Sequence, residues 1–186
     1  MPDPRRHPNV LNLDELPGDE QSQGDFAFRR RRLGPETGGR ALGCSHMEIP
    51  PGKTAFPFHF HSGFEEAIYV LEGTGTVRIG KQSVAVRGGD YVAFPAGPDT
   101  AHALTNTGTT PLLYLCLSAP ATPATMDIVG YPDSRKIAFA SGVDPVKGFR
   151  GGAWVMKLIK EQQPALGYYD DEPLAHVTAT TKKNEG

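Results

Sequence analysis

The residues of this chain with the clearest capacity for chemistry lie close together, between His59 and Glu66. His59 and His61 are two positions apart, and in a β-strand such residues project from the same face, while Phe60 points the other way. Two imidazoles held side by side can bind one metal ion through ring nitrogens at about 2.1 Å. A lone His-x-His pair fits a polar strand face equally well, so further ligands are needed to distinguish the two interpretations.

Two later residues supply candidate third and fourth ligands. Glu66 stands at the head of the next expected strand, so an antiparallel return brings its carboxylate back across from the histidines. His102 begins a further expected strand, with Leu104 and Asn106 on its face. Three imidazoles and one carboxylate suit Fe, Mn, Ni, Co, Cu or Zn and disfavour Ca or Mg. The residues predict one divalent transition metal ion, and the sequence leaves its identity open.

The elements that must position these side chains are predicted to be short strands. Residues 42–118 are a succession of apolar runs interrupted by turn residues, as in sandwiches and barrels. Residues 74–79 and 83–87 alternate apolar and polar side chains around Gly80-Lys81, which predicts a hairpin. Residues 91–94 and 112–117 are apolar on both faces, which indicates a covering layer or a partner subunit. The inward candidates of the hairpin are Val77, Ile79, Val84 and Val86.

The flanks carry weaker patterns. Residues 1–25 are polar and proline-containing, which predicts an extended arm with little structure of its own. The basic run at 29–32 is interpreted as a strand with a solvated face, in preference to an anion or RNA patch. After Pro120, residues 136–140 fit an edge strand, residues 153–162 are the helix candidate and residues 176–186 are expected to be frayed.

Composition limits the class of protein. A chain of 186 residues fits one domain, and its 22 glycines and 17 prolines favour strands and turns over long helices. The net charge of −2 gives no basic field for nucleic acid, so no nucleic-acid partner is expected. With only Cys44 and Cys116, no disulfide framework is indicated. No apolar run approaches the length of a membrane span, and we expect a cytoplasmic protein.

Two groups of residues have characteristic spacings. The first group consists of Gly52, Pro57, His59, His61, Glu66 and Gly73. The second consists of Gly89, Pro95, Gly97, His102 and Asn106. Together they resemble the paired motifs of the cupin family, over roughly residues 42–118. The second group departs from the family only in a longer run between its second glycine and its histidine.

The resemblance implies an all-β fold, the double-stranded β-helix or cupin jelly-roll barrel. It places an arm at 1–25, the barrel at 26–145 and a C-terminal extension at 146–186. Carried over, the metal ligands are His59, His61, Glu66 and His102. The spacing to Gly73 favours Glu66 over its neighbour Glu65, which must point to the opposite face of a strand.

The implied function is metal-dependent chemistry on a small organic molecule, a carboxylate, enol or diol that chelates the ion. Cupins that resemble this chain include oxygenases, oxalate-degrading enzymes and sugar isomerases. The alternative is a non-catalytic module that captures a small ligand, as in the auxin-binding proteins, and a zinc hydrase is a weaker alternative. No catalytic acid or base is evident from the residues. Family members commonly pair, so we also expect a homodimer.

The remaining histidines and cysteines lie outside the predicted ligand set and are interpreted as structural or solvated. They are His7, His46, His176, Cys44 and Cys116.

Overall fold

The structure is a computed structural model of the whole chain, and it describes residues 6–120, 126–141 and 155–160. The described chain is built from strands that pair antiparallel, with three 3-10 helices, η1 (Leu13–Glu15), η2 (Pro35–Thr37) and η3 (Pro98–Thr100). The first eight strands are β1 (Asp19–Gln23), β2 (Phe26–Arg32), β3 (Gly43–Ile49), β4 (Phe60–His61), β5 (Phe64–Glu72), β6 (Thr74–Ile79), β7 (Gln82–Arg87) and β8 (Tyr91–Phe94). The remainder are β9 (His102–Thr105), β10 (Leu112–Pro120), β11 (Met126–Tyr131), β12 (Lys136–Ser141) and β13 (Val155–Lys160).

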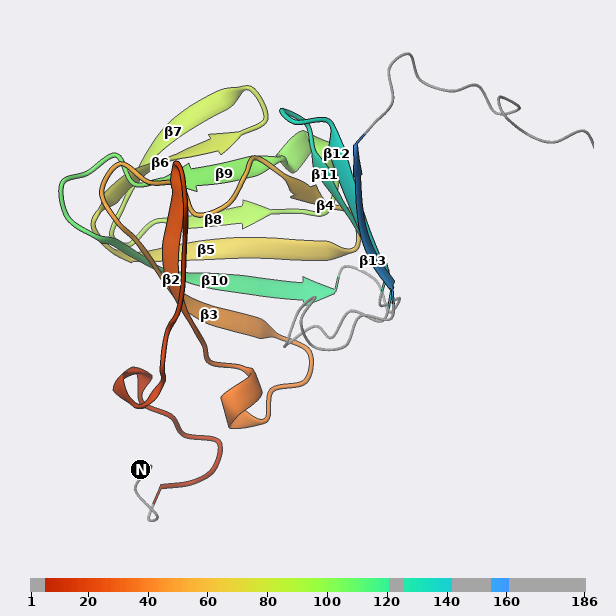
Figure 1. Cartoon of the computed structure of the whole chain (residues 1–186). Helices are drawn as coiled ribbons and strands as arrows, with labels where there is room; N and C mark the ends of the chain where they lie inside the picture. Colours follow the sequence, from red (N-terminus) through yellow and green to blue (C-terminus); the bar gives the residue numbers. More distant parts are fainter. Residues whose placement is uncertain (1–5, 121–125, 142–154, 161–186) are drawn as a thin grey trace, which may run out of the picture.

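Three sheets enclose the interior. The largest has the order β1-β2-β3-β10-β5-β8, and a second has the order β7-β6-β9. The main core cluster draws side chains from both of these sheets, including Met47, Val70 and Tyr114 from the first and Val77 and Leu104 from the second. The third sheet, β13-β12-β11-β4, lies across one end of the other strands (Figure 1). The fold is therefore the all-β jelly-roll barrel expected from the sequence.

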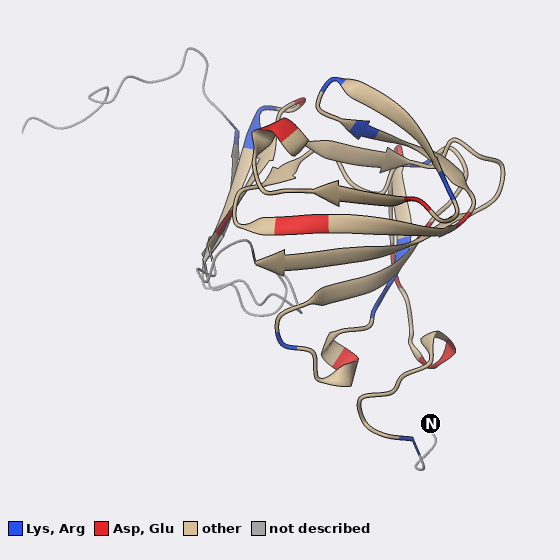
Figure 2. Cartoon of the chain, turned by 180° about the vertical axis from the view of Figure 1, so that it is seen from behind, with Lys and Arg blue, Asp and Glu red and all other residues tan. Residues whose placement is uncertain are grey.

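The large sheet presents two different faces. Ile68, Val70 and Tyr114 point into the core, whereas Tyr69 and Tyr91, which face each other across β5 and β8, are 40% and 60% exposed on the outside. Seen from behind, the strands carry few charged residues, with an acidic stretch on β5 as the clearest exception (Figure 2). That stretch is Glu65-Glu66, at the end of the sheet where β4 and β11 lie.

The predicted hairpin forms where expected, with Gly80 in the left-handed region at a φ of 55°. Val77 and Val86 are buried and Ile79 is partly buried. The inward assignment of Val84 is wrong, because Val84 is 47% exposed. It lies near the turn end of β7, whereas Val86, two residues further along the same face of that strand, is 5% exposed.

Both flanks of the chain differ from their predictions. Residues 12–23 are more ordered than a plain arm, since η1 carries a capping box at Asn12 and β1 pairs with β2 along its whole length. Residues 155–160 form strand β13 and not a helix, and β12 is an interior strand between β11 and β13. Residues 176–186 lie outside the described part of the chain. None of the described helices is long or apolar enough to cross a membrane.

Candidate metal centre

The two histidines of the first motif sit on a short segment that runs between two other strands. Strand β4 contains only Phe60 and His61, and His59 joins His102 through a bridge in which each backbone N–H donates to the other residue's carbonyl oxygen. On the other side, Val129 pairs with His61, and Gly130 pairs with Phe60. The alternation predicted for a strand is kept, because the Phe60 ring lies over Gly130 while the histidines turn toward the interior.

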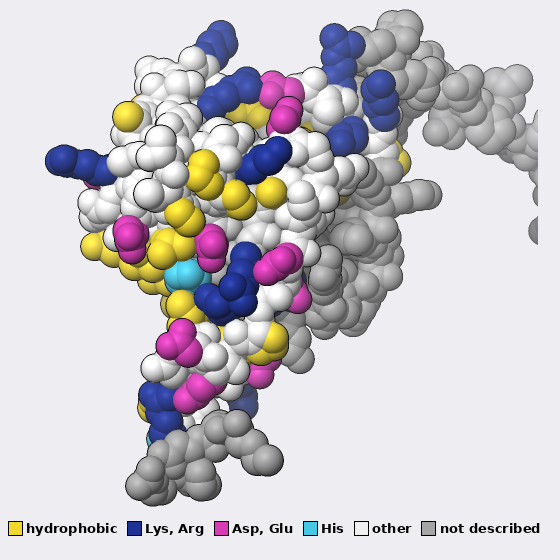
Figure 3. Space-filling view, turned by 60° about the vertical axis from the view of Figure 1, so that its left-hand side comes forward, with side chains coloured by type: hydrophobic (Ala, Val, Ile, Leu, Met, Phe, Trp, Pro, Cys, Tyr) yellow, Lys and Arg dark blue, Asp and Glu magenta, His cyan; other side chains and the backbone are white. Residues whose placement is uncertain are grey.

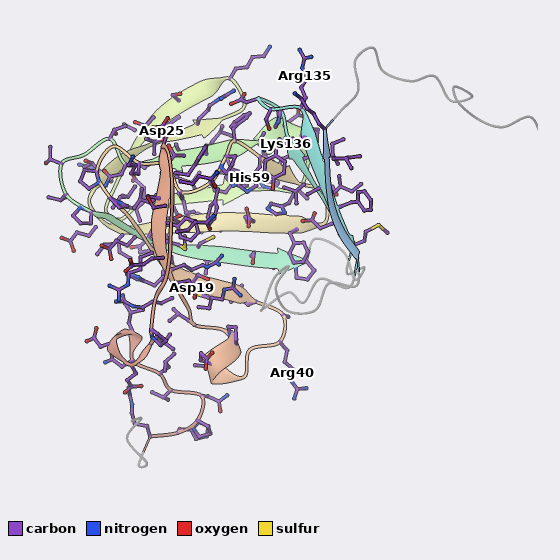
Figure 4. The ribbon with its side chains drawn as sticks, in the orientation of Figure 1. Asp19, Asp25, Arg40, His59, Arg135 and Lys136 are labelled. Atoms are coloured by element: carbon purple, nitrogen blue, oxygen red, sulfur yellow. The ribbon has the colours of Figure 1, made fainter. Side chains whose placement is uncertain are left out.

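The four predicted ligands come together at one point. Glu66 reaches it from β5 and His102 from β9, so these two side chains meet the histidines of the first motif only through the tertiary fold. In Figure 4 His59 is labelled among the strands, whereas Arg40 projects away from them. The Oε2 atom of Glu66 lies 3.8 Å from Nε2 of His59, 3.5 Å from Nε2 of His61 and 3.3 Å from Nε2 of His102.

The spacing of these atoms is close to that of ligands of a single ion, with one of the three distances inside the expected range and two of them about 0.1–0.4 Å above it. Donors each about 2.1 Å from one metal and about 90–110° apart are separated by about 3.0–3.4 Å. Ligand atoms of His59, His61 and Glu66 all lie within 4.8 Å of one another, so these three residues could hold a metal ion. His102 approaches the group through Glu66, and its inclusion as a ligand remains a prediction.

The other ring nitrogen of each histidine meets an oxygen that can only accept a hydrogen bond. Nδ1 of His59 lies 2.7 Å from the carbonyl oxygen of Pro57, and Nδ1 of His102 lies 3.0 Å from that of Thr100. Nδ1 of His61 lies 2.5 Å from the carboxylate of Asp127. A carbonyl or carboxylate oxygen requires the proton on Nδ1, so in the neutral rings the lone pairs sit on the Nε2 atoms that face Glu66.

The electrostatics of the cluster are those of a buried charge set. Burial alone would raise the pKa of Glu66, but His61 and the other histidines outweigh it and lower that pKa to about 2. Burial lowers the pKa of His59 to about 4. Burial also opposes protonation of His61, yet the carboxylates of Glu66 and Asp127 raise its pKa. The site thus favours an anionic Glu66 and positive charge beside it.

Glu65 and His46, which by residue type could also have been metal ligands, lie apart from the cluster. Glu65 is exposed and pairs with Ala119, on the opposite face of β5 from Glu66. His46 is 7% exposed and lies opposite Leu115, whereas its neighbour Met47 belongs to the core. Burial lowers the pKa of His46, so the neutral ring is favoured there. Neither side chain belongs to the group that could hold a metal ion.

Aromatic rings border the cluster. The Phe94 ring stacks on His102 with centroids 3.6 Å apart and planes 6° apart. Phe56 meets His59 edge-on at 6.3 Å, and Tyr131 stacks beside His59 at 6.1 Å. Burial, followed by the charge of Asp127, raises the pKa of Tyr131, so its phenol keeps its proton at neutral pH. The sequence analysis did not single out Tyr131, which lies beyond both motifs.

The basic run on β2 is divided between the two faces of the sheet. Arg30 faces Met47 across the β2–β3 pair and is therefore on the interior side, with its guanidinium 5.5 Å from the Phe28 ring centroid and its side chain 20% exposed. Burial and the Glu66 charge raise the pKa of Cys116, and Arg30 opposes them. The sequence predicted a solvated face for this strand, but Arg30 lies on its interior face. Over the coloured part of the face in Figure 3, basic and acidic side chains are interspersed.

Asp127 is a second residue of the site that the sequence did not reveal. It lies on β11, is 1% exposed, and contacts His61 and the following loop. The available signal was an acidic residue inside the short strand-like run Met126–Tyr131. The sequence does not show that this residue contacts His61, because Asp127 and His61 are 66 residues apart in the chain.

Comparison with known proteins agrees with the fold. Residues 45–118 match the family model of the cupin domain. The barrel is a cupin domain. The cupin domain is 36% identical over 72 residues to an uncharacterised protein of Methanocaldococcus jannaschii, a match that takes in 39% of this chain and 55% of that protein. The chain therefore spans about half the length of the curated relative it matches.

Solved cupin structures share the fold over different extents. A protein provisionally assigned as a sugar phosphate isomerase, from Acidithiobacillus ferrooxidans, is 25% identical with a TM-score of 0.71, and the match covers 86% of this chain and 97% of that one. A sugar phosphate isomerase of Silicibacter pomeroyi is 19% identical with a TM-score of 0.67 and the same coverage of both chains. A predicted oxalate decarboxylase of Thermotoga maritima is 24% identical with a TM-score of 0.52, covering 60% of this chain and 98% of that one.

Proposed function

We propose that this cupin binds one divalent transition metal ion through His59, His61, Glu66 and His102 and acts on a small organic molecule that chelates the ion. The observation that carries the proposal is the common orientation of the three imidazoles. In each ring the Nδ1–H group donates a hydrogen bond to an oxygen, and Nε2 faces the same oxygen of Glu66. Lone pairs and a carboxylate gathered in this way repel one another unless positive charge lies among them.

When bound, the ion would supply Lewis-acid polarisation of a substrate oxygen or a site for oxygen activation. The chain's own residues set what can approach. Phe56 and Phe94 border the site with apolar rings, and the Tyr131 phenol can donate a proton or a hydrogen bond from beside His59. Arg30 lies on the interior side of the large sheet but is paired with Asp19 at 3.9 Å. The bound ion and its aromatic border would favour an organic anion over an uncharged polyol.

An isomerase of phosphorylated sugars is the first activity to test, because the relative that shares 25% identity over 86% of the chain carries that assignment. An oxygenase acting on a carboxylate or diol is the second. A non-catalytic binding module is the runner-up from a different class, since aromatic rings around a metal can grip a ligand without turning it over.

The decisive experiment is metal analysis of protein purified without chelators, followed by assays of sugar phosphate isomerisation and of oxygen consumption with carboxylates and diols. His59→Ala, His61→Ala and His102→Ala should each abolish stoichiometric metal binding while circular dichroism still reports a folded barrel. Retention of full metal binding by all three variants would refute the proposed site.

Tyr131→Phe separates an enzyme from a binding module. The substitution removes only the phenolic oxygen, so metal affinity should be unchanged. An enzyme that uses the phenol as a proton donor should lose kcat with little change in KM. Ligand binding with no turnover in the wild-type protein would favour the module.

A further inference from the structure

The carboxylate of Asp127 makes contacts with three groups of the ligand segment. One oxygen, Oδ2, accepts the Nδ1 proton of His61 at 2.5 Å. The other, Oδ1, accepts the backbone N–H groups of Ser62 at 3.2 Å and Gly63 at 2.9 Å. Because the side chain is only 1% exposed, water cannot solvate the carboxylate, and these three hydrogen bonds take the place of its hydration.

The chain is shaped to let Asp127 come this close. A Cβ on Gly63 would fall 2.2 Å from the carbonyl oxygen of Met126, and a Cβ on Gly130 would fall 2.1 Å from the Phe60 ring. Gly63 meets backbone and therefore requires glycine if β11 is to lie against the segment 60–63, whereas a larger residue at position 130 would have to displace the Phe60 ring. Ser62 adds a reciprocal tie, since its N–H donates to the Ile128 carbonyl and its Oγ accepts the Ile128 N–H.

We propose that Asp127 is a positioning residue of the metal site, which fixes the ring of His61 in the Nδ1–H tautomer so that the Nε2 lone pair faces the ion. This inference rests on the metal site of the proposed function. Residue 127 lies outside residues 45–118, the part that matches the cupin family model. A carboxylate behind a metal-ligating histidine orients the ring and raises its basicity, and its loss costs about 10- to 100-fold in metal affinity.

A purely structural role is the competing explanation, because Asp127 also fastens β11 to the loop after β4. The Asp127→Asn variant distinguishes the two. Its carbonyl oxygen can keep the N–H groups of Ser62 and Gly63, and its amide nitrogen then faces His61 as a donor. A donor at that place favours the opposite tautomer, with the proton on Nε2, where it blocks the metal.

The matched control is Ser62→Ala, which removes the hydrogen bond from the Ile128 N–H but leaves the contact between Asp127 and His61 in place. It weakens the attachment of β11 without changing the histidine. We therefore expect this variant to melt at a lower temperature and to retain wild-type metal affinity.

The experiment measures cobalt(II) affinity by titration calorimetry and the His61 tautomer by ¹⁵N NMR of metal-free protein at a pH where the ring is neutral. Asp127→Asn should weaken cobalt binding about 10- to 100-fold and move the proton from Nδ1 to Nε2. Wild-type affinity with an unchanged tautomer would overturn the proposal, as would an equal loss of affinity in Ser62→Ala. If the wild-type protein binds no metal, the proposed function fails, while the tautomer measurement still tests the orientation of His61.

Discussion

Replacing Glu66 by Gln removes a buried negative charge from among three histidines while keeping the size of the side chain. The pKa of Glu66 is lowered from 4.5 to about 2, so its ionised form is favoured in the fold. A shift of this size corresponds to about 3 kcal/mol. Because Gln resembles the neutral acid, Glu66→Gln should lower the free energy of unfolding of the metal-free protein by about 3 kcal/mol at pH 7.

The pH dependence of this difference has a fixed sign. A carboxylate whose pKa is depressed in the fold contributes stability that is complete above its unfolded pKa and is lost as the pH falls through its folded pKa. For Glu66 that window runs from 4.5 down to about 2. The gap between wild type and Glu66→Gln should therefore be full at pH 7 and should have narrowed at pH 3.

Metal binding should respond in the same direction. A dication should attract this carboxylate at least as strongly as the histidines do, so a loss of about 3 kcal/mol predicts at least about 100-fold weaker binding. Urea denaturation in chelator and calorimetric titration with cobalt(II) measure the two effects. The control is Glu65→Gln, because Glu65 is exposed on the other face of β5. If Glu65→Gln were the damaging change, the assignment of the fourth ligand would be wrong.

Three further outcomes are expected. Chelator should lower the melting temperature more at pH 7.5 than at pH 5. The pKa of His61 is raised, so protons displace the metal ion from its ring as the pH falls. Equal effects of chelator on the melting temperature at both pH values would argue against histidine ligands. Phe94→Ala should cost about 3–5 kcal/mol in urea denaturation, since the ring is 3% exposed, whereas Val84→Ala, at 47% exposure, should cost less than about 1 kcal/mol. The exposed pair Tyr69 and Tyr91 supports a homodimer, and a single 20.0 kDa species in sedimentation at micromolar concentration would contradict it.

The parts of the site that could be predicted depend on local geometry. The two-residue spacing of His59 and His61 puts both rings on one face whatever the rest of the chain does. The hairpin between β6 and β7 was equally local, because Gly80 adopts the positive φ that the turn requires. The exposed position of Val84 was not predictable, since alternation identifies a face of a strand but not whether another strand covers it.

The parts that could not be predicted depend on pairing between distant segments. Residues 155–160 contain Met, Leu and Lys, which favour helix locally, but their pairing with β12 gives a strand. Asp127 reaches His61 only because β11 pairs with β4 in one register, Val129 opposite His61. The Gly130 and Gly63 positions that permit this approach have meaning only once the two segments are in contact.

If the proposed metal site is correct, its chemistry should also depend on a strand beyond the family motifs. Strand β11 lies after residue 118, yet it carries Asp127 behind His61 and Tyr131 beside His59. The motif residues would supply the ligands, whereas Asp127 would set the orientation of one ligand ring and Tyr131 would place a phenol beside another. Substitutions at Asp127 and Tyr131 should accordingly change the properties of the site while the four motif residues stay intact.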